Sequence, residues 1–170
     1  ENEKVLNDDY VKFLAYAESM IEKNGNGIVA MTTNNGYFDN QTFRGMRWHL
    51  RKTFDKIYVL DLHGNTKKKE MALDGSKDEN VFDIMQGVGI IIGIKTSIKK
   101  SSTLAEIYHA DLYGKRQMKY EQLDRGVEFK VIDSVEPSHY FVPHDNTGRD
   151  EYEKGIKLNE LFGKNVTGIV

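Results

Sequence analysis

The sequence predicts an α/β fold with a mainly parallel sheet and flanking helices. Three short apolar runs, at 27–35, 56–62 and 87–95, are rich in Val and Ile and are bounded by turns containing Gly or Asn, as is typical of buried strands. Helical patterns come before and after the first run, which predicts a helix–strand–helix unit. Ligands of open α/β sheets bind outside the carboxyl ends of the strands, so we expect a functional site at that edge.

The composition is that of one soluble globular domain. The chain has 170 residues, 39% of them hydrophobic, a net charge of −2 and no Cys. No run approaches the ~20 apolar residues of a membrane helix, so we expect no membrane partner. The lack of Cys excludes disulfides, Cys-ligated zinc and Cys nucleophiles, and it fits a reducing compartment. The net charge argues against a strongly basic nucleic-acid coat but permits a local basic patch.

Two amphipathic helices are expected on either side of the first strand. Asn7 or Asp8 can cap a helix that runs to about Lys23. Its apolar stripe, at helical spacing, consists of Tyr10, Phe13, Leu14, Ala17, Met20 and Ile21. A second helix is predicted over 42–54, with Phe43, Met46, Leu50 and Phe54 facing inward. The other faces, which we expect to be solvated, would carry Arg44, Arg47, Arg51 and Lys52.

The later part of the chain alternates between strands and polar loops. The glycines within 87–95 predict the close approach of another backbone. The segment 105–112 alternates polar and apolar residues, and its short spacing from 87–95 predicts an antiparallel hairpin between the two. Further predictions are a helical turn at 81–85, helices at 115–123 and 150–162, and a strand at 129–134. The chain turns irregular from Pro137.

Few catalytic patterns are present. Neither G-x-G-x-x-G nor the P-loop pattern occurs between a strand and a helix. His139, His144 and Asp145 form only a weak metal-ligand pattern, so we expect no metal site. Asp61 and His63 lie two residues apart, on the same face of a strand, and can form a pair. Without a nucleophile beside them, a packing or loop-anchoring role is favoured.

Two lysine groups lie in polar loops. Lys67, Lys68 and Lys69 belong to a ~17-residue loop after the second strand, a length more often found in functional or disordered loops. Lys99 and Lys100 follow the third strand. Such groups can bind DNA phosphates, or they can simply be solvated, and the composition favours neither interpretation.

Four ordered blocks, at 27–37, 43–47, 58–65 and 78–88, resemble one family. They are similar to the second half of the adenine-N6 DNA methyltransferase module in single-chain restriction–modification proteins, the fused type IIG and single-polypeptide type I enzymes. The similarity is strong over 8–96. Leu161-Phe162 and 166–170 resemble the entry to the target-recognition region. The resemblance implies a partial Rossmann-like sheet, with the three runs as fifth, sixth and reversed seventh strands. It also implies a division into 1–136, the methyltransferase part, and 137–170, the segment leading toward target recognition.

The family transfers a methyl group from S-adenosyl-L-methionine to N6 of an adenine flipped out of double-stranded DNA. Its catalytic motif is [Asn/Asp/Ser]-Pro-Pro-[Tyr/Phe], whereas Pro137 and Pro143 are isolated here, and the glycine-rich cofactor loop is also missing. The family's stacking aromatic late in the seventh strand is replaced by Gly93-Ile94. We therefore assign no catalytic or cofactor-binding residue. The resemblance implies a prokaryotic cytoplasmic fragment, inactive alone, whose partners are DNA and the rest of the parent polypeptide.

Supporting positions follow from sheet geometry and charge. Residues expected to border the flipped-base pocket are Thr33, Asn34, Asn35 and Tyr37, and candidates for DNA backbone contact are Lys67, Lys68, Lys69, Arg44 and Arg47. The alternative function is a non-catalytic DNA-binding or scaffold domain derived from the same fold; half of a small-molecule or RNA methyltransferase is a weaker third. Because an incomplete sheet exposes an edge, we also expect self-association or marginal stability.

Overall fold

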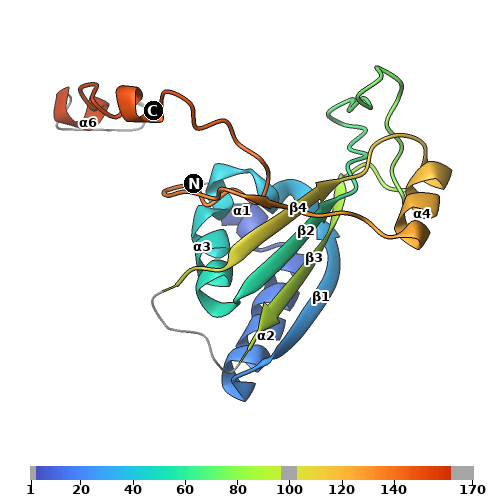
Figure 1. Cartoon of the computed structure of the whole chain (residues 1–170), viewed down its shortest axis with the longest axis horizontal. Coiled ribbons are helices and arrows are strands. Elements are labelled where there is room, and N and C mark those ends of the chain that lie inside the picture. The colour runs from blue at the N-terminus through green and yellow to red at the C-terminus, as the bar shows by residue number, and fades with distance from the viewer. Residues whose placement is uncertain (1–2, 97–102, 162–170) are drawn as a thin grey trace.

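The computed structural model describes residues 3–96 and 103–161, which form a mixed five-stranded sheet with helices on one face (Figure 1). The strands are β1 (Gly27–Asn34), β2 (Lys56–Asp61), β3 (Val88–Lys95), β4 (Glu106–Asp111) and β5 (Lys130–Ile132). The helices are α1 (Glu3–Leu6), α2 (Asp9–Asn24), α3 (Arg44–Thr53), α4 (Arg116–Arg125), α5 (Arg149–Tyr152) and α6 (Leu158–Leu161), with 3₁₀ turns η1 (Asn35–Phe38) and η2 (Gln41–Phe43).

The sheet order is β1-β3-β2-β4-β5, with β3 antiparallel to both of its neighbours. The predicted α/β fold with flanking helices is confirmed, but the prediction of a mainly parallel sheet is wrong, since only β2 and β4 pair in parallel. The connection from β2 to β3 contains no helix and returns the chain at the same edge, so β3 must run backwards. Among the described residues, β1 has no partner strand on its outer side.

The predicted hairpin between 87–95 and 105–112 is also wrong. Strand β4 lies beside β2, with Tyr58 opposite Tyr108 and Asp61 opposite Asp111. The backbone N–H of Ala105 donates to the carbonyl of Arg51, and that of Glu106 donates to the carbonyl of Asp55. These hydrogen bonds place the beginning of β4 next to the end of α3. Strand β4 therefore pairs with the edge of β2 that β3 leaves free.

Helices α2 and α3 cover one face of the sheet and build the main core with it (Figure 1). Leu14 of α2 and Leu50 of α3 are buried against Ile57 and Ile91 of the sheet. The predicted stripe of α2 is partly wrong, because Phe13 and Met20 are exposed. The described core-facing residues of α2 are instead Tyr10, Val11, Leu14, Ala17, Glu18 and Ile21.

The inward side of α3 is as predicted, with Phe43, Leu50 and Phe54 buried. The expectation that all its cations are solvated is wrong, because Arg47 and Arg51 are buried as well. Both guanidinium groups donate to backbone carbonyls of the segment 134–138, so long-range hydrogen bonds compensate for their loss of water.

The glycines of β3 leave room mainly for aromatic rings. The prediction that another backbone approaches holds only at Gly89, where a Cβ atom would also lie 3.1 Å from the carbonyl oxygen of Leu60. A Cβ atom on Gly89 would lie 2.4 Å from the ring of Phe38, and one on Gly93 would lie 3.0 Å from the ring of Phe54. Residues 89 and 93 of β3 are therefore glycine because phenylalanine rings of the core occupy the space that their side chains would need.

Other local predictions have mixed outcomes. Helix α4 and strand β5 confirm the predictions at 115–123 and 129–134. Residues 81–85 contain bends but no helix, and the helix predicted at 150–162 is split into α5 and α6. Phe141, in the irregular segment, is fully buried in the main core. Lys99, Lys100, Phe162 and 166–170 lie outside the described residues. In the part of the chain that is described, no helix has the length and apolar character to span a membrane.

Candidate functional site

The carboxyl ends of β1, β2 and β4 meet at one edge of the sheet and surround a cavity of about 270 Å³. This is where the fold class predicts a site. The residues that line the cavity are mostly polar: Asn35, Phe38, Asp39, Asp61, His63, Lys68, Glu70, His109, Asp111, Tyr113, Val142 and Pro143. Four carboxylates face one lysine and two histidines there.

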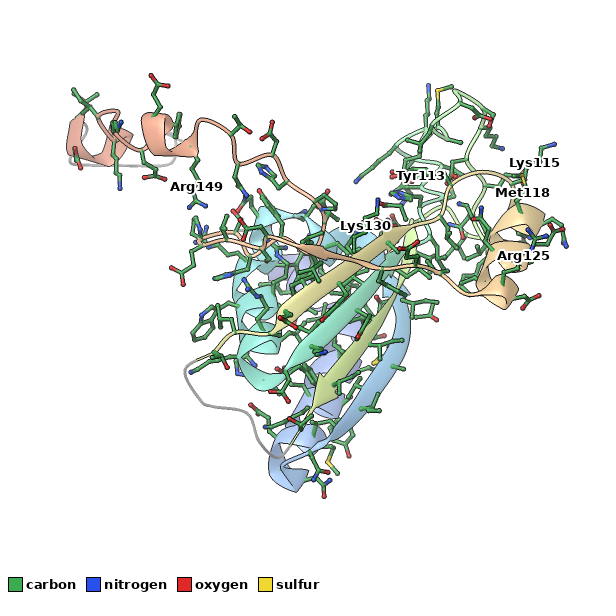
Figure 2. All side chains as sticks on the ribbon, viewed as in Figure 1. Tyr113, Lys115, Met118, Arg125, Lys130 and Arg149 are labelled. Carbon is green, nitrogen blue, oxygen red and sulfur yellow. The ribbon has the colours of Figure 1, made fainter. Side chains whose placement is uncertain are left out.

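His63 contacts three other residues that line this cavity, namely Asp61, Asp111 and Tyr113. Its backbone N–H donates to Oδ1 of Asp61 at 2.8 Å, and its Nε2 lies 2.8 Å from Oδ1 of Asp111. The His63 ring stacks on Tyr113, with 3.9 Å between the ring centroids, and Figure 2 shows Tyr113 on the chain that leads from the sheet to α4. His63 has φ 51°, a left-handed conformation that a non-glycine residue rarely adopts. The predicted Asp61–His63 pair is present, with Nδ1 of His63 3.7 Å from Oδ1 of Asp61. The prediction that the two share one strand face is wrong, because β2 ends at Asp61 and His63 is left-handed. Sequence spacing gave no sign of Asp111.

Burial and neighbouring charges shift the protonation of this group. Burial raises the pKa of the Asp61 carboxyl, although the amide of Asn35 donates to its Oδ1 at 2.9 Å. Burial disfavours the charged form of His63, but the hydrogen bond to Asp111 and the nearby carboxylates outweigh this and raise the pKa of His63. Burial lowers the pKa of His109, whose Nδ1 lies 3.5 Å from Oδ2 of Asp111. Of the two histidines, His63 is therefore the easier to protonate and His109 the harder.

The four residues expected beside a flipped-base pocket lie in three different environments. Asn35 lines the cavity. Asn34 caps η1 by accepting from the backbone N–H of Gly36 at 2.7 Å. Thr33 and Tyr37 are buried below the edge, with the hydroxyl of Thr33 3.2 Å from that of Tyr37, and neither lines the cavity.

The two arginines expected to contact DNA are in different environments. Arg44 is exposed at the start of α3. Arg47 is fully buried, and burial lowers the pKa of its guanidinium to about 10. That guanidinium donates to the carbonyls of Tyr37, Asn40 and Ser138 at 2.7–3.0 Å. The prediction for Arg47 is therefore corrected: it is an internal brace between α3 and the segment around Ser138.

Lys67, Lys68 and Lys69 are exposed on the loop that follows β2, and Lys68 also lines the cavity. The base of the loop is ordered by Asn65, whose backbone N–H donates to Oε2 of Glu70 at 2.7 Å and whose Oδ1 accepts from the backbone N–H of Lys68 at 3.1 Å. Three exposed lysines therefore lie on a hydrogen-bonded turn at the carboxyl edge of the sheet.

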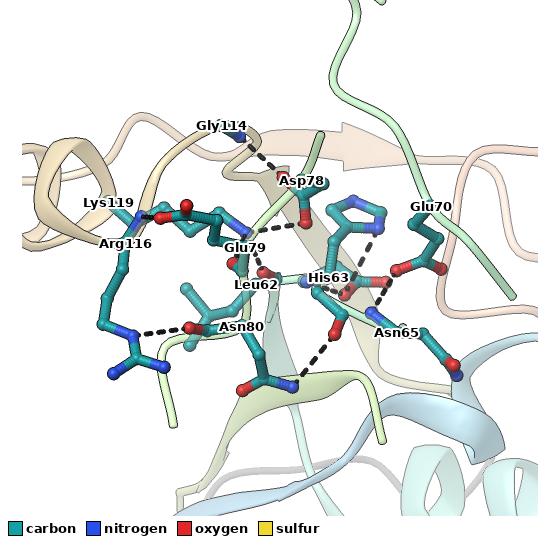
Figure 3. Close-up of polar contacts among 12 residues, drawn as sticks. Leu62, His63, Asn65, Glu70, Asp78, Glu79, Asn80, Gly114, Arg116 and Lys119 are labelled. Atoms are coloured by element: carbon teal, nitrogen blue, oxygen red, sulfur yellow. Dashed lines mark hydrogen bonds and ion pairs between the residues drawn. The ribbon is translucent and has the colours of Figure 1, made fainter. Parts of the chain in front are cut away.

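Helix α4 holds this loop from the other side (Figure 3). Nζ of Lys119 is fully buried and donates to the carbonyls of Leu62 and Glu79 at 2.7 Å and to Oδ2 of Asp78 at 2.8 Å. Arg116 donates from Nε to the carbonyl of Asn80 at 2.8 Å. Sequence analysis missed Lys119, because α4 is so polar that its pattern marks no buried face.

Gly64 closes the loop against the sheet. It has φ 79°, and a Cβ atom there would lie 2.4 Å from Cα of Asn80. The amide of Asn80 donates to the carbonyl of Gly64 at 3.1 Å and to that of Gln86 at 2.6 Å. The glycine of the 63–65 turn is therefore required by its conformation and by the backbone packed against it.

The histidines of the weak metal pattern have other partners. Nδ1 of His139 lies 2.9 Å from Nη1 of Arg51, and His144 stacks on Tyr140 at 4.8 Å between centroids. Within residues 3–96 and 103–161, the three residues able to offer converging metal ligands are Asp61, His63 and Asp111, whose ligand atoms lie within 4.8 Å of one another.

No protein-family model matches the sequence, and no curated protein matches it. Several solved structures do match this chain. The ATP-dependent Type ISP restriction-modification enzyme LlaBIII bound to DNA is 31% identical over 86% of this chain, with a TM-score of 0.72. The DrdV–DNA complex is 26% identical over 81%, with a TM-score of 0.65. A nuclease-deletion mutant of the Type ISP enzyme LlaGI, in complex with a DNA substrate mimic, shares the fold at 22% identity over 85%, with a TM-score of 0.67.

This chain spans only 10%, 13% and 14% of the lengths of those three chains, respectively. It is therefore similar to one part of much larger proteins, two of which are restriction-modification enzymes.

Proposed function

We propose that the chain is the later half of the methyltransferase sheet of a site-specific DNA adenine-N6 methyltransferase in a restriction–modification system. Its partners would be double-stranded DNA and the rest of the parent polypeptide, in the cytoplasm of a prokaryote. The observation that carries this proposal is the 31% identity over 86% of the chain with a DNA-bound Type ISP restriction-modification enzyme. The four sequence blocks that resemble the methyltransferase module support the same proposal from the sequence alone.

The topology supports the methyltransferase assignment. A reversed last strand is what the resemblance implies, and β3 runs antiparallel to β1 and β2. In this interpretation β1, β2 and β3 are the fifth, sixth and seventh strands. The carboxyl edge that carries Asn35, His63 and the lysine turn would then face the same side as the reaction centre.

Four glycines in or beside the sheet have no free space where a cofactor could lie against them. At the sheet, the space beside Gly64 is filled by Asn80, that beside Gly87 by Asn35, and that beside Gly89 and Gly93 by phenylalanine rings. The sequence also lacks the family's catalytic Pro-Pro motif. We therefore assign cofactor binding and the methyl-transfer step to other parts of the parent enzyme, and we expect this chain alone to be inactive.

The role left to this chain is to support and contact DNA. Lys67, Lys68 and Lys69 place three ammonium groups on a turn whose base is bound by Glu70, and Arg44 adds an exposed guanidinium at the start of α3. Contacts of lysine with phosphates supply affinity without sequence information, so this surface would position the duplex while the recognition sequence is read elsewhere.

The test is DNA affinity as a function of salt. With Lys67, Lys68 and Lys69 all changed to Ala, we expect weaker binding to a fluorescent duplex. The log–log salt slope should fall in magnitude by about 1 for each of these lysines that binds a phosphate in the native chain. The matched control changes the exposed Lys12, Lys23 and Lys56 to Ala, which removes the same charge from other surfaces. Equal slopes for the two triple variants would remove the loop from the DNA interface.

A further inference from the structure

Asp61, His63 and Asp111 converge from the ends of two parallel strands. Residues 61 and 111 are register partners of β2 and β4, so their side chains emerge next to each other, and His63 turns back between them. The ligand atoms of all three lie within 4.8 Å of one another. Asp61 is 6% exposed, and the cluster opens into the 270 Å³ cavity.

The spacing suits coordination of a metal ion. Nε2 of His63 and Oδ1 of Asp111 are 2.8 Å apart. Neighbouring ligands of a six-coordinate ion with bonds of about 2.1 Å lie about 3 Å apart, so these two atoms are already at ligand spacing. The Asp61 carboxylate, within 4.8 Å, would close onto the ion by a small movement of its side chain. The stacked ring of Tyr113 and the amide of Asn35 already fix the orientations of His63 and Asp61, as outer partners do at metal sites.

An independent observation comes from His109. It is 4% exposed, lines the same cavity, and its Nε2 has no hydrogen-bond partner among the described residues. Buried imidazole nitrogens almost always have one. Nδ1 lies on the Asp111 side, 3.5 Å from Oδ2 of that carboxylate, so His109 adjoins the cluster and still has one buried nitrogen without a partner.

We propose that Asp61, His63 and Asp111 form a binding site for a first-row divalent transition-metal ion, represented by Zn²⁺ or Mn²⁺. One imidazole with two carboxylates suits these ions, whereas Mg²⁺ and Ca²⁺ favour oxygen ligands alone. The remaining positions belong to water, with His109 as its hydrogen-bond partner. The site joins the ends of β2 and β4 beneath the lysine turn, and it goes beyond the DNA role proposed above without depending on it.

The test is calorimetric titration of the full chain with Zn²⁺, Mn²⁺ and Mg²⁺ at pH 7.5. We expect about one equivalent of Zn²⁺ or Mn²⁺ to bind, with Mg²⁺ much weaker. Asp111→Asn and His63→Gln should each weaken binding by roughly tenfold or more. The matched controls are Asp83→Asn and His49→Gln, which remove a carboxylate and an imidazole that do not line the cavity. Unchanged binding in both site variants would show adventitious surface binding and overturn the proposal, as would no binding by the native chain.

A measurement on the native chain covers the possibility that a variant fails to fold. Histidine ring NMR signals should shift for His63 and His109 on addition of one equivalent of Zn²⁺, with His49 and His144 unchanged. Shifts at His49 or His144 with none at His63 would place the ion elsewhere and contradict the assignment.

Discussion

Nζ of Lys119 lies 2.8 Å from Oδ2 of Asp78, and both side chains are fully buried. The pair joins α4 to the loop that carries the lysine turn, and the same ammonium group also satisfies the carbonyls of Leu62 and Glu79. One internal cation thereby links α4 to two backbone segments of a surface loop with little secondary structure, alongside the contacts of Arg116 and Asn80.

We predict that Lys119→Met destabilises the chain by about 3–5 kcal/mol, because it leaves the Asp78 carboxylate buried without a counter-charge. Urea denaturation followed by circular dichroism measures the effect. Changing Asp78 to Asn in the same chain should recover part of the stability, since the uncompensated charge is removed. A destabilisation below about 1 kcal/mol in the single variant would mean that the pair does not hold the loop.

Gly64→Ala should be far more harmful than Gly75→Ala, although both glycines have φ near 80°. Both variants incur the strain of a left-handed residue, about 1–3 kcal/mol. A Cβ atom at residue 64 would also lie 2.4 Å from the backbone of Asn80, whereas residue 75 has nothing within 4 Å. Thermal unfolding of the two variants should therefore differ clearly, and equal melting temperatures would contradict the described packing.

Arg47→Met tests the internal brace. It would leave the carbonyls of Tyr37, Asn40 and Ser138 without their shared donor, so we expect the free energy of unfolding in urea to fall by about 2–4 kcal/mol. Arg44→Met, on the exposed side of the same helix, should stay within about 0.5 kcal/mol. The opposite order of effects would place the guanidinium of residue 47 at the surface.

The pH dependence of His63 has a definite sign. Its pKa in the folded chain is raised above 6.5, so the protonated ring contributes stability below pH 6.5, and this contribution disappears as the pH rises through the folded value. Asp111→Asn removes the carboxylate charge beside Nε2 of His63 and should lower the His63 pKa measured by NMR titration. His109 should titrate below 6.5 in the same spectra. An unchanged His63 pKa in the variant would contradict the contact with Asp111.

The strands and most helices were predictable because apolar periodicity reports burial directly. The pairing of the strands was not, since the direction of β3 depends on where the 62–87 connection returns, and no local pattern contains that information. The predicted buried face of α2 was wrong at Phe13 and Met20. Periodicity shows that a helix is amphipathic, but it does not show which residues at the border of the apolar face are covered by the sheet.

The site was predictable only in outline. The carboxyl edge followed from the fold class. The Asp61–His63 pair was found from its closeness in the sequence, although His63 lies beyond the end of β2 and not on its face. Arg47 and Lys119 were missed as internal residues, because a long cationic side chain is normally solvated and only its partners in distant segments reveal that it is buried. Asp111 came to His63 through the parallel register of β4, which the sequence did not predict.

The most direct test of the proposed function is to sequence DNA for N6-methyladenine after expression of the full-length parent enzyme. We predict that one short recognition sequence is modified, and that changing Lys67, Lys68 and Lys69 to Ala reduces the modified fraction relative to the control variant at Lys12, Lys23 and Lys56. Absence of N6-methyladenine with stable, DNA-binding protein present would contradict the methyltransferase proposal and favour a non-catalytic DNA-binding domain.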